Sequence, residues 1–111
     1  MRYRVTKAHK PDDLKPLVFR KGERLAFERR PTGWEGWVWC ISQDGRGGWT
    51  PESWLSLEGD ACVALRDYDS TELDLNVGDV VLADILESGW ARVKDERGRA
   101  GWVPVDCLQK V

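Results

Sequence analysis

The sequence has no long apolar run, because charged residues, which make up 32% of the 111 positions, interrupt every hydrophobic stretch. A membrane-spanning helix needs about 20 consecutive apolar residues. The basic N-terminal residues are also not followed by the apolar stretch of a secretory signal. We therefore expect no transmembrane span, no membrane partner and a cytoplasmic location.

Histidine and cysteine are scarce. The three cysteines, Cys40, Cys62 and Cys107, are an odd number without close spacing, which fits reduced thiols better than a disulfide framework or a zinc site. The single histidine, His9, falls in a loop and is expected to be solvated. Catalysis needs a pocket and an oriented base. The sequence therefore predicts no enzyme activity, no catalytic residue, no metal and no cofactor.

Long helical periodicity is also missing, and the best helical candidate, residues 51–57, is two turns at most. What the chain has instead is seven tryptophans and 11 glycines. This composition favours short strands joined by turns. Net charge is only −2, but residues 1–58 hold 11 Lys/Arg and 8 Asp/Glu, whereas residues 59–111 hold 6 and 11. Such an asymmetry could orient the two halves or a partner.

The chain repeats itself. The octapeptide at 48–55 (Gly-Trp-Thr-Pro-Glu-Ser-Trp-Leu) matches the one at 101–108 (Gly-Trp-Val-Pro-Val-Asp-Cys-Leu) at an offset of 53. Upstream, residues 17–23 match residues 73–79 at an offset of 56, and the change of offset falls in the loop-like stretch before Trp37. Self-similarity in the same order marks a duplicated unit.

Each repeat reads as a small barrel of short strands. The second carries strand patterns at 62–65, 79–86, 89–94 and 99–104, and the first carries them at 24–27, 37–41 and 48–50. Turn sequences at 43–46 and 95–98 fall between them. We expect barrels at 1–57 and 61–111, and the short connection at 57–61 predicts that they touch.

The second repeat resembles Src-homology-3 (SH3) domains. Residues 64–68 (Ala-Leu-Arg-Asp-Tyr), 72–75 (Glu-Leu-Asp-Leu), Trp90 and 101–104 (Gly-Trp-Val-Pro) are similar to that family's signature blocks. The first repeat shows the later blocks, but residues 3–9 stand where the first signature block is expected. The whole chain resembles bacterial tandem SH3 proteins of unassigned function, which implies an all-β fold of two SH3-like barrels packed together.

The resemblance implies binding of extended or proline-rich segments in an aromatic groove. A polyproline II segment is already ordered, flat rings accept it, and an acidic loop holds a basic flanking residue. In the second repeat, Arg66 and Cys107 replace two signature tyrosines. In the first, Ala8 falls where a groove tyrosine is expected. The predicted ligand-binding residues are Trp37, Trp49, Pro51, Trp54, Asp12 and Asp13 in the first repeat, and Tyr68, Glu72, Trp90, Trp102 and Pro104 in the second.

The first repeat is expected to hold the principal site, because three tryptophans occupy its groove positions. Two other functions stay open. One is a structural or self-association module, including a homodimer. The other is a small barrel that binds nucleic acid, although the acidic residues interleaved with the basic ones argue against this partner. Trp49 and Trp102 could also be scaffold residues. The strand register predicts that Cys40 and Val93 lie in the cores and that Cys107 is at least partly exposed.

Overall fold

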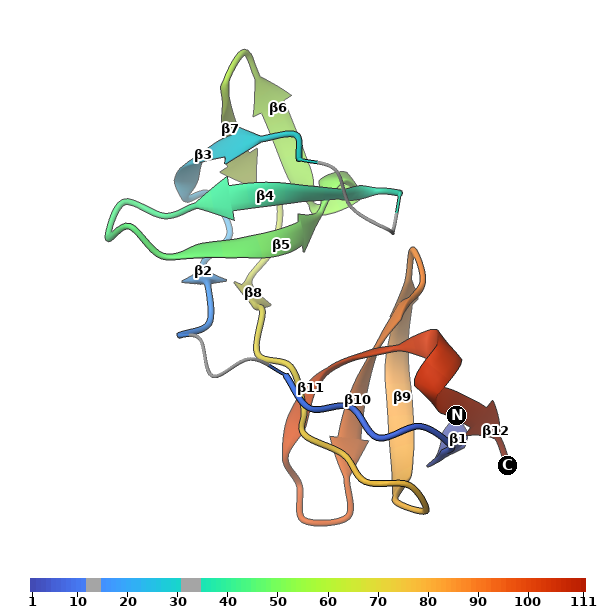
Figure 1. Cartoon of the computed structure of the whole chain (residues 1–111). Coiled ribbons are helices and arrows are strands. Elements are labelled where there is room, and N and C mark those ends of the chain that lie inside the picture. Colours follow the sequence, from blue (N-terminus) through green and yellow to red (C-terminus); the bar gives the residue numbers. More distant parts are fainter. Residues whose placement is uncertain (12–14, 31–34) are drawn as a thin grey trace. The chain divides into compact units, whose positions relative to one another are not determined.

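The computed structural model describes residues 1–11, 15–30 and 35–111 (Figure 1). It is all-β, as expected, and none of its described residues form a helix long and apolar enough to cross a membrane. Two single-turn 3-10 helices, η1 and η2, follow the two Trp-x-Pro segments. The elements are β1 (Arg2–Val5), β2 (Val18–Phe19), β3 (Arg24–Glu28), β4 (Trp37–Ile41), β5 (Gly47–Pro51), η1 (Glu52–Trp54), β6 (Leu55–Glu58), β7 (Ala61–Ala64), β8 (Tyr68–Asp69), β9 (Val80–Glu87), β10 (Trp90–Asp95), β11 (Ala100–Pro104), η2 (Val105–Cys107) and β12 (Leu108–Lys110).

The strands divide into two compact barrel-like units. We call Met1–Leu14 together with Thr71–Val111 the split unit, and Lys15–Ser70 the continuous unit. The split unit holds a five-stranded sheet in the order β11-β10-β9-β1-β12. The continuous unit holds a five-stranded sheet in the order β5-β4-β3-β7-β6 and the short pair β2-β8.

The first strands of the two repeats have changed places. Strand β1, from the first repeat, pairs antiparallel with β9 and β12 of the second, so that Tyr3 lies between Val81 and Lys110. Strand β7, which begins the second repeat, pairs with β3 and β6 of the first, where Cys62 faces Leu25. The predicted barrels at 1–57 and 61–111 are therefore not the compact units of the structure.

A tight turn explains this division. Glu58 pairs with Ala61, which leaves only Gly59 and Asp60 between β6 and β7, and Gly59 has a φ of +67°. A two-residue Gly-Asp connection between strands is a hairpin signal. The segment that we interpreted as a link between domains is thus a β-hairpin turn, and it keeps β7 beside β6 in the continuous unit.

Each unit has its own apolar core of alternating inward residues. In the split unit this core comprises Val5, Leu73, Leu75, Val81, Ala91, Val93 and Val103. In the continuous unit the most buried side chains include those of Leu17, Phe19, Val38, Cys40 and Cys62. The inward positions of Cys40 and Val93 are confirmed, since they are 0% and 1% exposed.

Cys107 is only 6% exposed, so the prediction of an exposed thiol was wrong. It lies in η2 after Pro104, at the position that Trp54 occupies in the first repeat, and both side chains are buried. Its carbonyl oxygen also accepts the Thr6 N–H at 2.8 Å, which fixes this turn against the N-terminal arm of the split unit.

Candidate functional site

The groove positions of the continuous unit come from both repeats. Trp37 begins β4 and faces Pro51 at the end of β5, while Trp54 lies in the following turn. Tyr68, on β8, places its ring 5.4 Å from the Trp54 ring in an edge-to-face arrangement. The Tyr68 hydroxyl donates a 2.6 Å hydrogen bond to the Trp49 carbonyl oxygen. Because β8 follows β7 into the continuous unit, a tyrosine from the second repeat completes this set of residues.

The aromatic rings of this groove are not an open platform. Trp37 and Trp54 are each 8% exposed and Tyr68 is 6% exposed. Over Trp54, the cover includes a side chain of the same unit, because the Arg66 guanidinium carbon lies 3.8 Å from the ring centroid. Arg66 stands where the SH3 signature carries a tyrosine, and it is itself exposed. A ligand of this groove must therefore bind beside Arg66 or displace it.

Carboxylates near this groove already have partners. Asp67 accepts the backbone N–H of Lys21 at 2.8 Å and lies 3.9 Å from the Arg20 guanidinium. Glu52, which follows the groove proline, accepts a 2.5 Å hydrogen bond from Arg29. The acids Asp12 and Asp13, predicted for this groove, lie outside the described residues.

Trp49 belongs to a different cluster. It pairs across the strands with Trp39, and the two rings meet edge to face at 5.3 Å. Arg30 lies 4.5 Å above the Trp39 ring. A Cβ at Gly47 would come within 2.5 Å of Trp39, so this glycine lets the indole lie close to the strand backbone. The structure therefore places Trp49 in a cross-strand pair with Trp39.

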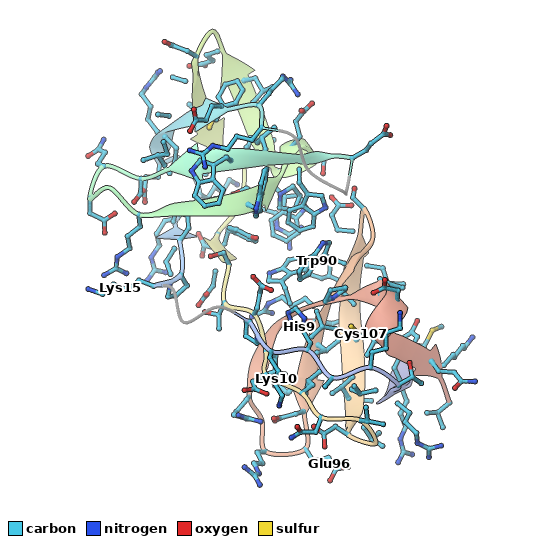
Figure 2. The ribbon with its side chains drawn as sticks, viewed as in Figure 1. His9, Lys10, Lys15, Trp90, Glu96 and Cys107 are labelled. Carbon is cyan, nitrogen blue, oxygen red and sulfur yellow. The ribbon has the colours of Figure 1, made fainter. Side chains whose placement is uncertain are left out.

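The split unit carries the corresponding positions with different side chains. His9 pairs with Leu75 as Tyr68 pairs with Phe19, so His9 takes the place of the groove tyrosine. Figure 2 shows His9 beside Trp90, and the ring centroids are 5.8 Å apart in an edge-to-face arrangement. The expectation of Ala8 at this position was wrong by one residue.

His9 is also not a solvated loop residue. Its side chain is 16% exposed, and its Nε2 lies 2.8 Å from a carboxylate oxygen of Glu72. Lys10 next to it donates hydrogen bonds to Asp74 at 2.6 Å and to Asn76 at 2.7 Å. Aligning the two strand starts, Val5 with Ala64, would have found this histidine in the sequence.

The remaining predicted residues of the second repeat lie in the split unit. Trp90 faces Pro104 across β10 and β11, and Glu72 forms a backbone bridge with Trp102. Trp102 is 2% exposed, in keeping with a scaffold residue. Tyr68, expected to line the same groove, lies in the continuous unit instead.

Burial raises the pKa of all three cysteine thiols. Burial raises the pKa of Cys40 to about 12, although a hydrogen bond with Thr50 opposes this rise. Burial also raises the pKa of Cys62 and that of Cys107. A raised pKa lowers the thiolate fraction and hence nucleophilicity. Within the described ranges, His, Cys, Asp and Glu form no group of three that could hold a metal ion.

Two small barrel-like units of short strands, with aromatic side chains at these positions, define an SH3-like fold. A family model for the variant SH3 domain matches residues 2–58, which is more than half of the chain, so the chain belongs to this family. No curated protein and no solved structure matches it. The matched range starts in the split unit and continues into the continuous unit.

Proposed function

We propose that this protein is a non-catalytic module that binds extended, proline-rich protein segments at the groove of the continuous unit. The proposal rests on the contact between the Tyr68 and Trp54 rings, beside the cross-strand pair of Trp37 and Pro51. These four residues match the groove positions of the SH3 family, although they come from two repeats. Rings that meet edge to face beside a proline are the residue types against which a polyproline II segment packs.

The proposal includes a second SH3-like domain in the second half of the sequence. Its support is the repeat itself and the matching strand registers, in which Val5 faces Leu108 as Ala64 faces Leu55. Kinship with bacterial tandem SH3 proteins and packing of the two barrels together are further parts of the proposal. A cytoplasmic location is another, and it rests on the three free cysteines.

A structural or self-associating role is the second candidate. The low exposure of Trp37 and Trp54 favours it, because rings that are already buried offer less area to a ligand. In that case the chain would serve as a packing module, with a homodimer as its simplest product.

Matched variants at equivalent positions separate the two roles. Trp37→Ala removes the central ring of the continuous unit, and Trp90→Ala removes its counterpart in the split unit. With a twelve-residue proline-rich peptide as the probe, we expect Trp37→Ala to weaken binding by about 2 kcal/mol, the size of an interface hot spot. Trp90→Ala should change it little, and circular dichroism should show that both variants fold.

The readout is peptide titration followed by amide and indole chemical shifts. Loss of binding in Trp90→Ala alone would move the site to the split unit. A probe that binds neither the parent chain nor either variant would favour the structural role, and sedimentation would then test for the homodimer.

A further inference from the structure

The position of the Arg66 side chain allows it to pair with an anion. Its guanidinium lies over the face of Trp54, which leaves the N–H donors at its edge pointing away from the ring. A planar guanidinium with free edge donors matches a carboxylate in a bidentate pair. Across the described ranges, no carboxylate forms an ion pair with this side chain. Since the stack orders the side chain in advance, less conformational entropy is lost on binding.

The loop arm beside this groove carries cations where its counterpart carries acids. In the split unit, the arm at 71–77 holds Glu72 and Asp74. At the equivalent positions of the continuous unit stand Pro16 and Val18, and this arm, at 15–21, holds three cations and no carboxylate.

Two of the described acids near the continuous-unit groove are already engaged. Asp67 is bound by the Lys21 backbone and lies near Arg20, and Glu52 is bound by Arg29. A basic ligand residue would have to compete with these partners, whereas an acidic one would meet Arg66. At Arg66, therefore, an acidic ligand residue would meet a cation, whereas an SH3 groove with an acidic loop offers a carboxylate to a basic residue.

We propose that the groove of the continuous unit selects extended segments that carry an aspartate or glutamate, through a carboxylate pair with Arg66. This rests on the proposed function, because it names the ligand chemistry of the same groove. The contact with Trp54 fixes the position of the Arg66 guanidinium in the groove. The acidic residue of the ligand would therefore flank the part of the ligand that lies near Trp37 and Pro51.

Three peptides with one proline-rich frame test this preference. They carry two glutamates, two glutamines or two arginines at the flank and are titrated at low and moderate salt. We expect the glutamate peptide to bind roughly tenfold tighter than the glutamine peptide, the scale of one charge-assisted bidentate pair, and the arginine peptide to bind most weakly. Arg66→Gln should abolish the difference, whereas Arg97→Gln, at an exposed arginine of the split unit, should preserve it.

The outcomes distinguish this inference from the proposed function. Equal binding of the three peptides, or preference for the arginine peptide, would overturn the acidic preference and leave the peptide-binding role standing. Binding of none would overturn both. A fourth probe, single-stranded oligothymidylate, is the polyanion control: tighter binding of it with a steep salt dependence would assign Arg66 to nucleic acid instead.

Discussion

At the scale of single residues, equivalent positions in the two units carry side chains of different chemistry. His9 replaces Tyr68, Cys107 replaces Trp54, and a neutral cross-strand partner becomes a charged one where Trp39 corresponds to Arg92. Arg92 lies 3.9 Å from Asp84 and faces Trp102, so the split unit has a charged side chain where the continuous unit has an indole. The two copies of the repeat therefore share a backbone and differ in what their surfaces can contact.

Asp95 makes the stability of the split unit dependent on pH. Burial raises the pKa of this carboxyl, but hydrogen bonds from the Arg99 side chain and from the backbone N–H groups of Arg99 and Arg97 outweigh burial, so the pKa is lowered. A lowered native pKa stabilises the fold at pH values above the unfolded pKa of about 3.9. That contribution is lost as the pH falls through the native pKa.

We expect Asp95→Asn to destabilise the protein at pH 7 by about 1 kcal/mol, because Asn keeps an accepting oxygen but loses the charge that strengthens these hydrogen bonds. The difference from the parent chain should shrink below pH 4, where the parent carboxyl also becomes neutral. Urea denaturation at both pH values measures it. Asp84→Asn is the control, since that side chain is 69% exposed. An effect of Asp95→Asn that stays constant down to pH 2 would contradict the role of its ionisation.

Gly47 should control the Trp39–Trp49 pair. In Gly47→Ala the new methyl group would lie 2.5 Å from Trp39, too close for any real contact, so the indole has to swing away from the strand. We expect the exciton signal of the edge-to-face indoles in circular dichroism to weaken, with a modest loss of stability. Gly45→Ala is a poor control because its φ is +85°, whereas Arg46→Ala changes the same hairpin without touching the ring. An unchanged exciton signal in Gly47→Ala would show that the pair does not depend on this glycine.

At the scale of elements, local signals were predictable and long-range pairing was not. The strands around Val81 and Val38 and the turns at 43–46 and 95–98 follow from alternation and Asp-Gly or Gly signals, which are properties of a few neighbouring residues. The positions of Trp37, Pro51 and Trp54 came from the resemblance to SH3 domains, whereas Tyr68 was expected in the other barrel. The partner of β1 lies more than 70 residues away, so two repeats of similar shape leave two possible partners for each first strand.

The pair of Cys40 and Cys62 tests the exchange directly. The two thiols are fully buried in the core of the continuous unit and each affects the pKa of the other, although they belong to different repeats. With a mild thiol oxidant in urea below the unfolding midpoint, we expect an intrachain disulfide between them, detected by peptide mass mapping. The reaction should be slow in buffer alone because burial raises the pKa of Cys40. If crosslinks to Cys107 formed as readily, the placement of β7 would be wrong.

At the scale of the whole chain, one unit is inserted into the other. The ends of the continuous unit meet, because the Ser70 N–H donates to the Leu17 carbonyl at 2.9 Å and the Leu17 N–H donates to the Ser70 hydroxyl at 2.7 Å. The split unit depends on the folded continuous unit, which holds the ends of its two segments together. Without it, the two segments would be joined by a loop of more than fifty unfolded residues, whose closure costs entropy. The continuous unit has no such dependence.

Paired core variants should reveal this asymmetry. Val38→Ala in the continuous unit and Val103→Ala in the split unit each remove methyl groups from a core position that is 0–1% exposed, at a cost of roughly 2 kcal/mol. We expect Val103→Ala to weaken hydrogen-exchange protection in β9–β11 alone, and Val38→Ala to weaken it in both units. The isolated segment 15–70 should fold. Equal and local effects of both variants would contradict the hierarchy.

The exchange also redistributes charge. The sequence halves differ in net charge, but the split unit holds nine Lys/Arg and ten Asp/Glu, and the continuous unit holds eight and nine. Lys10 shows the effect locally, since it bonds Asp74 and Asn76. If β1 and the residues after it lay in the continuous unit, the equivalent neighbours of Lys10 would be Val18 and Arg20. Lys10 would then lose its ion pair and lie next to a like charge. The charge asymmetry of the sequence thus favours the exchanged strand partners.

The insertion sets the order in which the molecule would yield to a pulling force. Both chain ends belong to the split unit, where Arg2 and Val111 are hydrogen-bonded and β1 runs antiparallel to β12 (Figure 1). Tension on the two ends would therefore break the hydrogen bonds between these strands one after another. The continuous unit would bear load only afterwards, through β2 and β8, so the groove with Arg66 and Trp54 would stay folded after the split unit has opened.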